Sequence, residues 1–385
     1  MQVMCEHFGN CGGCSWQDVD YDEQLRRKEH SVSRALNGLG DMEFFPIIPS
    51  PEIWFYRNKM EFTFSGKEGD VKIGMHERGR FDRIIDINKC FLLSEYSNGI
   101  IDFFRDFANR KRIRVYHPKT HRGFLRYLVI REGKNTEEVL VNLITTGDDF
   151  RYKDELVEAF QSSFSRVKAF FWGINTRVAD TAIAEELKLL YGKPYLEERI
   201  SSLSLLVSPV AFFQPNTKAT EKLYSVIEDF AGLSTNEIVL DLYCGVGGIG
   251  IYLGKYAGRV YGIELSDEAI LDARKNADLN NVKNTSFYKG DVKELLRQTS
   301  SSEFDGKISL VVVDPPRSGI PRKVLRRICD VKSKKIIYVS CNPRVLEGDM
   351  SYLVTEGGYR ITRVQPLDMF PHTPHVETVL LLERR

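Results

Sequence analysis

The sequence contains no long hydrophobic run. No apolar stretch among its 385 residues reaches the roughly 18 residues that a membrane-spanning helix needs. The first residues, MQVMCEHFGNCGG, lack the basic and apolar segments of a secretory signal peptide. The formal net charge is only +1, so the surface as a whole is not built to bind polyanions. We therefore expect a globular cytoplasmic protein that does not contact membranes.

Internal repeats and low-complexity segments are also absent. A chain of 385 residues is too long for one ordinary hydrophobic core, which predicts two domains. The first half contains short strand-like runs between turn signals, and residues 151–163 have a helical spacing of apolar positions. Residues 217–232 show the same helical spacing. The pattern changes near residue 205, which predicts domains at 1–205 and 206–385.

The second half alternates apolar strands with helices. Such alternation is typical of a parallel, doubly wound α/β sheet. The expected strands are EIVLDLY, RVYGIEL, TSFYKGD, ISLVVVD, KKIIYVS and, at the C-terminus, ETVLLLE.

Seven cysteines are present, and in a cytoplasmic protein they favour metal or catalytic roles over disulfides. Cys5, Cys11 and Cys14 have the spacing C-x5-C-x2-C. Cys90, in INKCFLL, is a candidate fourth ligand that the fold would bring in. Four thiolates suit either a zinc ion or an iron–sulfur cluster, and the spacing does not separate the two.

A glycine-rich segment, DLYCGVGGIG, follows the strand that starts this alternation. Gly245, Gly247 and Gly250 fit the pattern GxGxxG, so a dinucleotide-binding fold is one interpretation. Glu264 closes the next strand, where a carboxylate can bind ribose hydroxyls. This placement suits either a nicotinamide cofactor or S-adenosylmethionine.

Three acidic residues favour S-adenosylmethionine. Asp241 precedes the glycines, where a carboxylate attracts a cationic ligand and repels a pyrophosphate. Asp291 closes the third strand, where it can accept a hydrogen bond from adenine, and Asp314 closes the fourth within VVVDPPRSG. Ligands of open α/β sheets bind at the carboxyl ends of the strands, where all these residues are expected.

Cys341, in VSCNP, ends the strand that follows DPPRSG. Glu377, in HVET, begins the last strand. A thiolate is a good nucleophile when its pKa is lowered or a partner assists, and a carboxylate at a buried strand end can act as a general base. Either residue alone fits packing or a surface charge, but the pair behind a methyl-donor site predicts catalysis. Cys244 and Cys329 are expected to be packing residues.

The motifs FFQPN, DLYCGVGG, GIE, DPPRSG, SCNP and HVET, in this order, resemble the uridine-C5 RNA methyltransferases. The resemblance implies a Rossmann-like S-adenosylmethionine-dependent methyltransferase domain, preceded by a mixed α+β RNA-binding domain. It implies that Cys341 is the nucleophile and Glu377 the base. The residues that it places at S-adenosylmethionine are Gln214, Tyr243, Gly248, Glu264, Asp291 and Asp314.

One branch of this family carries C-x5-C-x2-C and a distant cysteine that bind a [4Fe–4S] cluster. The resemblance thus favours iron–sulfur over zinc at Cys5, Cys11, Cys14 and Cys90. It is strongest to the shorter 23S ribosomal RNA enzymes, which lack an N-terminal β-barrel. We expect a monomer that modifies 23S RNA, with transfer RNA as the alternative.

Two stretches are candidates for RNA binding. Residues 110–126 are basic and contain no acid, and residues 54–62 are rich in aromatics. A solvated edge and core packing, respectively, explain them equally well.

Three other activities fit part of the pattern. A cytosine-C5 methyltransferase also uses a cysteine, but the carboxylate of Glu377 disfavours it. A non-catalytic RNA-binding assembly factor would not need the complete set of motifs. A dinucleotide oxidoreductase is disfavoured by Asp241 and DPPRSG.

Overall fold

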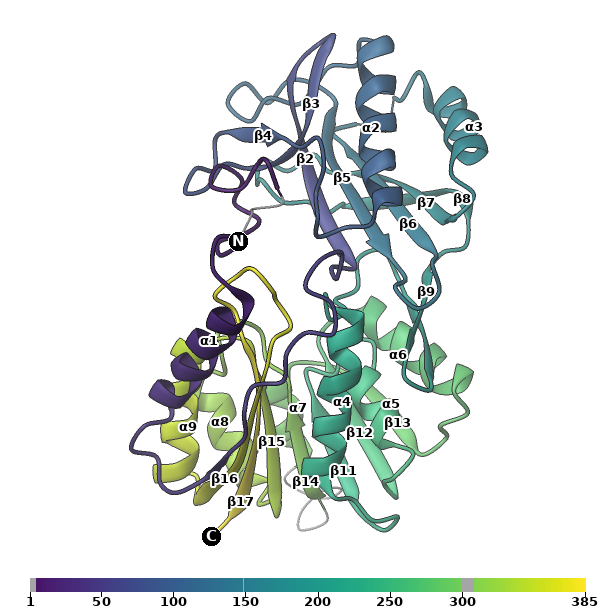
Figure 1. Ribbon diagram of the computed structural model, residues 1–385. Coiled ribbons are helices and arrows are strands. Elements are labelled where there is room, and N and C mark those ends of the chain that lie inside the picture. The colour runs from purple at the N-terminus through teal and green to yellow at the C-terminus, as the bar shows by residue number, and fades with distance from the viewer. Residues whose placement is uncertain (1–4, 148, 300–307) are drawn as a thin grey trace. The chain divides into compact units, whose positions relative to one another are not determined.

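The computed structural model describes residues 5–147, 149–299 and 308–385, and the chain divides into two units (Figure 1). Unit 1 comprises Met1–Val19, Glu52–Arg199 and Val207–Val210, and unit 2 comprises Asp20–Pro51, Ile200–Leu206 and Ala211–Arg385. The predicted boundary near residue 205 is therefore wrong for residues 20–51, which belong to the second unit. Among the helices of the described segments, none is long and apolar enough to cross a membrane.

Unit 2 is built on an eight-stranded sheet in the order β1-β16-β17-β15-β14-β11-β12-β13. The five strands from β15 to β13, at one end of this order, pair in parallel, and β17 runs antiparallel to β15 and β16. All six strands predicted in this half are confirmed. The strands are β1 (Glu43–Phe44), β11 (Ile238–Leu242), β12 (Arg259–Glu264), β13 (Thr285–Lys289), β14 (Ile308–Val313), β15 (Lys335–Ser340), β16 (Tyr359–Leu367) and β17 (Glu377–Arg384).

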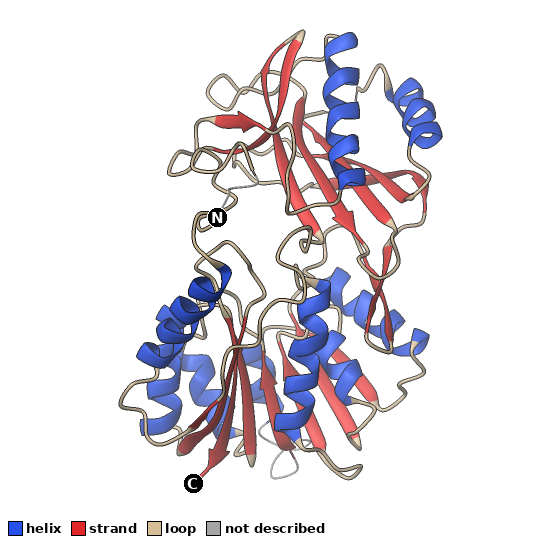
Figure 2. Cartoon of the chain, viewed as in Figure 1, coloured by secondary structure: helices blue, strands red, loops and turns tan. Residues whose placement is uncertain are grey.

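Helices cover both faces of this sheet (Figure 2). One apolar core lies under α4, α5 and α6, and a second lies under α1, α8 and α9. The helices are α1 (Tyr21–Ala35), α4 (Thr217–Ala231), α5 (Gly248–Leu253), α6 (Asp267–Leu279), α7 (Val292–Thr299), α8 (Arg322–Asp330) and α9 (Pro343–Thr355). The helix predicted at residues 217–232 is confirmed as α4.

Two contacts explain why residues 20–51 belong to unit 2. The Nζ atom of Lys28, on α1, lies 2.6 Å from Oδ1 of Asp368 and donates a second hydrogen bond to the carbonyl oxygen of Phe370. Both charged side chains of this pair are fully buried. In addition, β1 extends the sheet in parallel beside β16. The sequence did not predict α1, because its buried residues are Gln24, Lys28 and Val32 rather than an apolar stripe.

Unit 1 is a mixed sheet of seven strands in the order β4-β3-β2-β5-β6-β7-β8. Its apolar core is rich in phenylalanine, and α2 packs against β3. The helix predicted at residues 151–163 is confirmed as α3. The elements are β2 (Lys59–Lys67), β3 (Asp70–His76), β4 (Ile84–Asp86), α2 (Glu95–Arg110), β5 (Leu125–Glu132), β6 (Val139–Thr145), α3 (Lys153–Ser163), β7 (Val167–Ile174) and β8 (Glu186–Gly192). A separate ribbon pairs β9 (Leu196–Ile200) with β10 (Leu203–Val207).

Candidate active site and cysteine pocket

Sheet register brings the predicted catalytic pair together. In the antiparallel pairing of β15 with β17, Ser340 lies opposite Thr378. The next position in this register places Cys341 opposite Glu377. Because β14 is the parallel neighbour of β15, Asp314 follows its strand at the same edge of the sheet.

The turn from β15 into α9 fixes the backbone around Cys341. Asn342 is the N-cap of α9, and its side-chain oxygen accepts a hydrogen bond from the backbone N–H of Arg344 at 3.2 Å. Pro343 occupies the first helical turn, where its missing N–H costs nothing. The Asn342 side chain also donates to the carbonyl oxygen of Arg317, at 3.1 Å. SCNP is thus a strand-to-helix turn that is tied to the DPPRSG loop.

Burial and nearby charges shift the pKa values of both Cys341 and Glu377. The pKa of Cys341 is raised to about 11, chiefly by burial and then by the Glu377 carboxyl, whereas the Arg317 guanidinium opposes the rise. Burial also raises the pKa of Glu377 well above its ordinary value; Asp314 adds to this rise and Arg317 opposes it. Glu377 is only 2% exposed. The arrangement therefore holds a thiol, a carboxyl group that accepts protons readily, and one cation that favours the thiolate.

Asp314 is held by a residue from the FFQPN motif. Nε2 of Gln214 donates a hydrogen bond to Oδ2 of Asp314 at 2.8 Å. The pKa of Asp314 is raised to about 7 by burial, which outweighs the lowering effect of the bond from Gln214. Two residues predicted from motifs 100 positions apart are thus in direct contact.

Arg317 lies within DPPRSG, but the sequence alone did not predict a role for it. We expect Arg317→Gln to move the pH midpoint of Cys341 alkylation upward, because the variant removes the cation that lowers the thiol pKa. When the midpoint rises by about one pH unit, the thiolate fraction at lower pH falls about tenfold. Glu377→Gln should move the midpoint downward. Iodoacetamide labelling of Cys341, followed by peptide mass spectrometry across neutral to alkaline pH, measures both changes.

Arg344→Gln is the matched control for this experiment. Arg344 is an exposed arginine close in sequence, and it is not among the main groups that shift the Cys341 pKa. Its profile should coincide with that of the unsubstituted protein. An unchanged midpoint in Arg317→Gln would show that the guanidinium does not act on the thiol.

The glycine-rich loop leaves space beside β11. Tyr243 and Gly245 both have positive φ angles, of 62° and 53°. A Cβ atom at Gly245 would meet nothing within 4 Å, whereas one at Gly248 would lie 2.1 Å from the hydroxyl of Tyr224. Oε2 of Glu264 accepts a hydrogen bond from the Gly245 N–H at 3.2 Å. The loop thus forms an open cradle, with Glu264 at its side.

The buried acids of this site fit a cationic ligand. Asp241 is fully buried, and among the described residues no side chain donates a hydrogen bond to either of its oxygens. Burial, with the nearby Asp314 adding to its effect, raises its pKa to about 8. Uncompensated buried carboxyls are costly, and a cation offsets part of that cost. The donor set therefore fits S-adenosylmethionine, whose sulfonium and amino groups are positive.

Asp291 follows β13, as predicted, and is exposed. Its Oδ1 accepts a hydrogen bond from the Glu294 N–H at 3.1 Å, at the start of α7. Asp349, on α9, was not predicted from the sequence. It accepts hydrogen bonds from the Tyr338 hydroxyl and, at 3.0 Å, from the backbone N–H of Ile320. Asp349 thereby ties the end of the DPPRSG loop to the sheet, a role that no local sequence signal marks.

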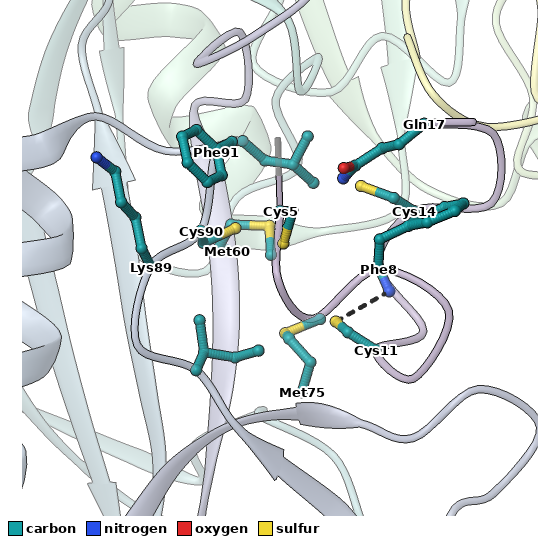
Figure 3. Close-up of a pocket in the computed structure, with 13 residues that line it drawn as sticks. Cys5, Phe8, Cys11, Cys14, Gln17, Met60, Met75, Lys89, Cys90 and Phe91 are labelled. Atoms are coloured by element: carbon teal, nitrogen blue, oxygen red, sulfur yellow. Dashed lines mark hydrogen bonds between the residues drawn. The ribbon is translucent and has the colours of Figure 1, made fainter. Parts of the chain in front are cut away.

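In unit 1, the four predicted cluster cysteines line one pocket (Figure 3). Cys5, Cys11 and Cys14 come from the N-terminal loop, and Cys90 comes from the segment after β4. The rest of the lining is largely apolar and includes Phe8, Met60, Met75, Ile87, Phe91 and Leu92. The fold therefore brings together residues that are up to 85 positions apart in the sequence (90 − 5).

The thiols influence one another. The pKa of Cys14 is raised to about 11, chiefly by burial and in smaller part by Cys11 and Cys5. The pKa of Cys90 is raised to about 12, chiefly by burial and in smaller part by Cys14 and Cys11. Within the described residues, no three His, Cys, Asp or Glu side chains stand close enough to hold a metal ion. In a zinc site, all four sulfur atoms would lie about 2.3 Å from a single ion. In a [4Fe–4S] cluster, each of the four thiolates binds a different iron.

The stretches predicted to bind RNA are only partly exposed. Tyr56 belongs to the core of unit 1, and Phe55 packs on Phe91 at 5.9 Å between ring centroids. In the basic stretch, Arg126 is buried and donates hydrogen bonds to the carbonyl oxygens of Asn175 and Ala179. It is not a surface cation. The exposed cations of this stretch are Arg110, Arg112, Arg114, Lys119 and Arg122.

Comparison with known proteins identifies the family. Residues 20–385 match the family tRNA (Uracil-5-)-methyltransferase. The chain belongs to this family. It is 41% identical to an uncharacterized RNA methyltransferase of Caldanaerobacter subterraneus and 40% identical to one of Clostridium tetani; each alignment covers at least 99% of this chain and 84% of the relative. The predicted resemblance is confirmed.

A solved structure extends the similarity to this family's fold. The tRNA (uracil-54, C5)-methyltransferase of Pyrococcus abyssi, in complex with S-adenosyl-L-homocysteine, is 32% identical, with a TM-score of 0.77. The match covers 96% of this chain and 85% of that chain. The mixed α/β methyltransferase fold predicted for unit 2 is confirmed.

Proposed function

We propose that this family member methylates carbon 5 of a uridine in 23S ribosomal RNA, with S-adenosylmethionine as the methyl donor. The observation that carries the proposal is the register of β15 and β17, which sets Cys341 opposite Glu377. Asp314 and Arg317 act on the pKa values of this pair. The cradle at Gly245 and the buried carboxyl of Asp241 support a cationic donor at the same edge of the sheet.

The chemistry assigns one step to each residue. Sγ of Cys341, as the thiolate stabilised by Arg317, adds to carbon 6 of the uracil, which places negative charge on the ring and makes carbon 5 nucleophilic. S-adenosylmethionine supplies the methyl group that carbon 5 receives. Glu377 then takes the remaining proton from carbon 5, and the bond between Cys341 and carbon 6 breaks. A raised pKa suits Glu377 to accept that proton.

Gln214, Tyr243, Gly248, Glu264, Asp291 and Asp314 are the residues that we propose to hold the donor. Glu264 and Asp291 suit the ribose and the adenine, because they follow consecutive strands. Gly248 permits the hydroxyl of Tyr224 to lie close to the glycine-rich loop, where a Cβ atom would clash with it.

Two classes of RNA are candidate substrates. The cluster cysteines and the ending QPLDMFPHTPHVE, which resemble those of 23S RNA enzymes, favour 23S RNA. The similarity to a transfer RNA enzyme favours transfer RNA. Mass spectrometry of 5-methyluridine in both RNAs from a deletion strain decides between them. Loss of the modification from 23S RNA, restored by the intact gene but not by Cys341→Ala, is the expected result. Loss from transfer RNA alone would assign the second substrate, and no loss from either would contradict the activity.

We propose a [4Fe–4S] cluster in the cysteine pocket. Cys5, Cys11, Cys14 and Cys90 would hold it, and the apolar lining would shield it from solvent. Methyl transfer needs no electron transfer, so the cluster would have a structural or RNA-positioning role.

Protein purified without oxygen should contain about four irons and about four acid-labile sulfides per chain. Cys90→Ser should lose most of this iron, because the fourth ligand is removed. Cys329→Ser is the control, since this half-buried cysteine lies outside the pocket. Stoichiometric zinc without iron would contradict the cluster.

A further inference from the structure

The loop between β3 and β4, residues 77–83, projects an aromatic side chain into solvent. Phe81 is 86% exposed, the largest exposed fraction among the large hydrophobic side chains of the described residues. The loop is nevertheless ordered at its base. The N–H of Glu77 donates to the carbonyl oxygen of Arg83, and the N–H of Arg80 donates to that of Glu77, both at 2.9 Å. We call residues 77–83 the Phe81 arm.

The N-terminal cysteine loop fastens this arm. The N–H of Gly12 donates to the carbonyl oxygen of His76 at 2.9 Å, and the N–H of Arg78 donates to that of Asn10 at 2.7 Å. The guanidinium of Arg78 also donates to the carbonyl oxygen of Cys14. These bonds connect the arm to the segment that carries three of the four pocket cysteines.

Two arginines lie close to the exposed ring in the sequence. Arg80 and Arg83 flank it in the sequence, and both are exposed. Each is ion-paired within the arm, Arg80 with Asp82 and Arg83 with Glu77, at 3.1 Å. Lys119, in the basic stretch 110–126, is close enough to contribute to the lowered pKa of Asp82. The basic stretch therefore approaches the arm at Lys119.

We propose that Phe81 stacks on an unpaired base of the substrate RNA, and that the cysteine loop holds the arm in position for this contact. This inference rests on the proposed function. A solvent-exposed aromatic ring beside arginines and a lysine suits single-stranded RNA, in which bases stack on rings while cations contact phosphates. A protein partner would require a wider apolar patch, and the neighbours of Phe81 are charged.

Phe81→Ala should weaken binding of the methylatable RNA by about 5- to 150-fold, the range expected for one stacked base. Affinity for S-adenosylmethionine should stay the same. Leu189→Ala is the matched control, because it removes an exposed apolar side chain from β8, at the opposite edge of the same sheet. Phe81→Trp should bind RNA normally, and its added fluorescence should be quenched by RNA, unlike that of Leu189→Trp.

Phe81→Leu separates stacking from general apolar contact. This variant should bind RNA as weakly as Phe81→Ala; binding equal to that of the unsubstituted protein would overturn stacking. An unchanged affinity in Phe81→Ala would overturn the contact itself. If the unsubstituted protein methylates RNA in the same assay, these failures concern the arm alone, whereas absence of methylation would contradict the proposed function.

The link to the cysteine loop has its own test. Cys11→Ser should weaken RNA binding and should accelerate trypsin cleavage after Arg80 and Arg83. Combined with Phe81→Ala, it should weaken binding by less than the product of the two single effects, because both act on one contact. Independent effects, or unchanged cleavage, would overturn the role of the cysteine loop.

Discussion

Replacing Glu377 with glutamine is expected to leave the protein covalently attached to its RNA. The amide cannot take the proton from carbon 5, so the bond between Cys341 and carbon 6 does not break after methyl transfer. Attack itself should persist, because removing the carboxyl lowers the pKa of Cys341. A protein–RNA band that resists denaturing electrophoresis should accumulate in proportion to enzyme, while turnover falls by at least roughly 100-fold.

Cys341→Ala is the companion variant to Glu377→Gln in this experiment. It should form no adduct and should abolish methylation, because the variant lacks the nucleophile. Adding Cys341→Ala to Glu377→Gln should remove the adduct band. Active Cys341→Ala protein would exclude covalent catalysis, and full turnover by Glu377→Gln would assign the base to another group.

Lys28→Met should have the largest effect on stability. The substitution leaves Asp368 buried without its cation, and loss of one partner of a buried ion pair costs about 3–5 kcal/mol. Burial lowers the pKa of Lys28, and the neighbouring Asp368 opposes that shift. The thermal transition of unit 2 should fall by roughly 2–4 °C for each kcal/mol.

Two variants control for this change. Arg26→Met alters an exposed residue of the same helix, whose ion pair with Glu23 lies at the surface, and should cost less than about 0.5 kcal/mol. Lys28→Met combined with Asp368→Leu should recover part of the stability, because no buried charge then remains unpaired. A transition unchanged in Lys28→Met would show that the buried pair is dispensable.

The sequence predicted what strand patterns and motifs encode. The strands around Asp241, Asp314 and Cys341 are continuous apolar runs, which identify parallel strands buried on both faces. Their order along the chain placed the acids and the cysteine at one edge of the sheet. β16 was missed, because charged residues such as Arg360 and Arg363 interrupt its apolar pattern.

The interactions that shift the pKa of Cys341 or hold the Phe81 arm join residues that are distant in the sequence. The effect of Arg317 on the Cys341 pKa requires the turn that Asn342 ties to the DPPRSG loop. The Phe81 arm became visible only when the structure showed its exposure and its bonds to the cysteine loop. Side-chain orientation and long-range hydrogen bonds of this kind have no periodic signal in a single sequence.

The polar contact face of α1 has a consequence for synthesis on the ribosome. Lys28 is translated 340 residues before Asp368, a delay of roughly 20–70 s at typical elongation rates. During that time the helix has no partner from the last strands of its sheet. Its contact residues Gln24 and Lys28 are polar and stay hydrated until the last strands are made. An apolar stripe would instead expose an aggregation-prone surface on the nascent chain. The buried ion pair therefore suits an element that emerges early and docks last.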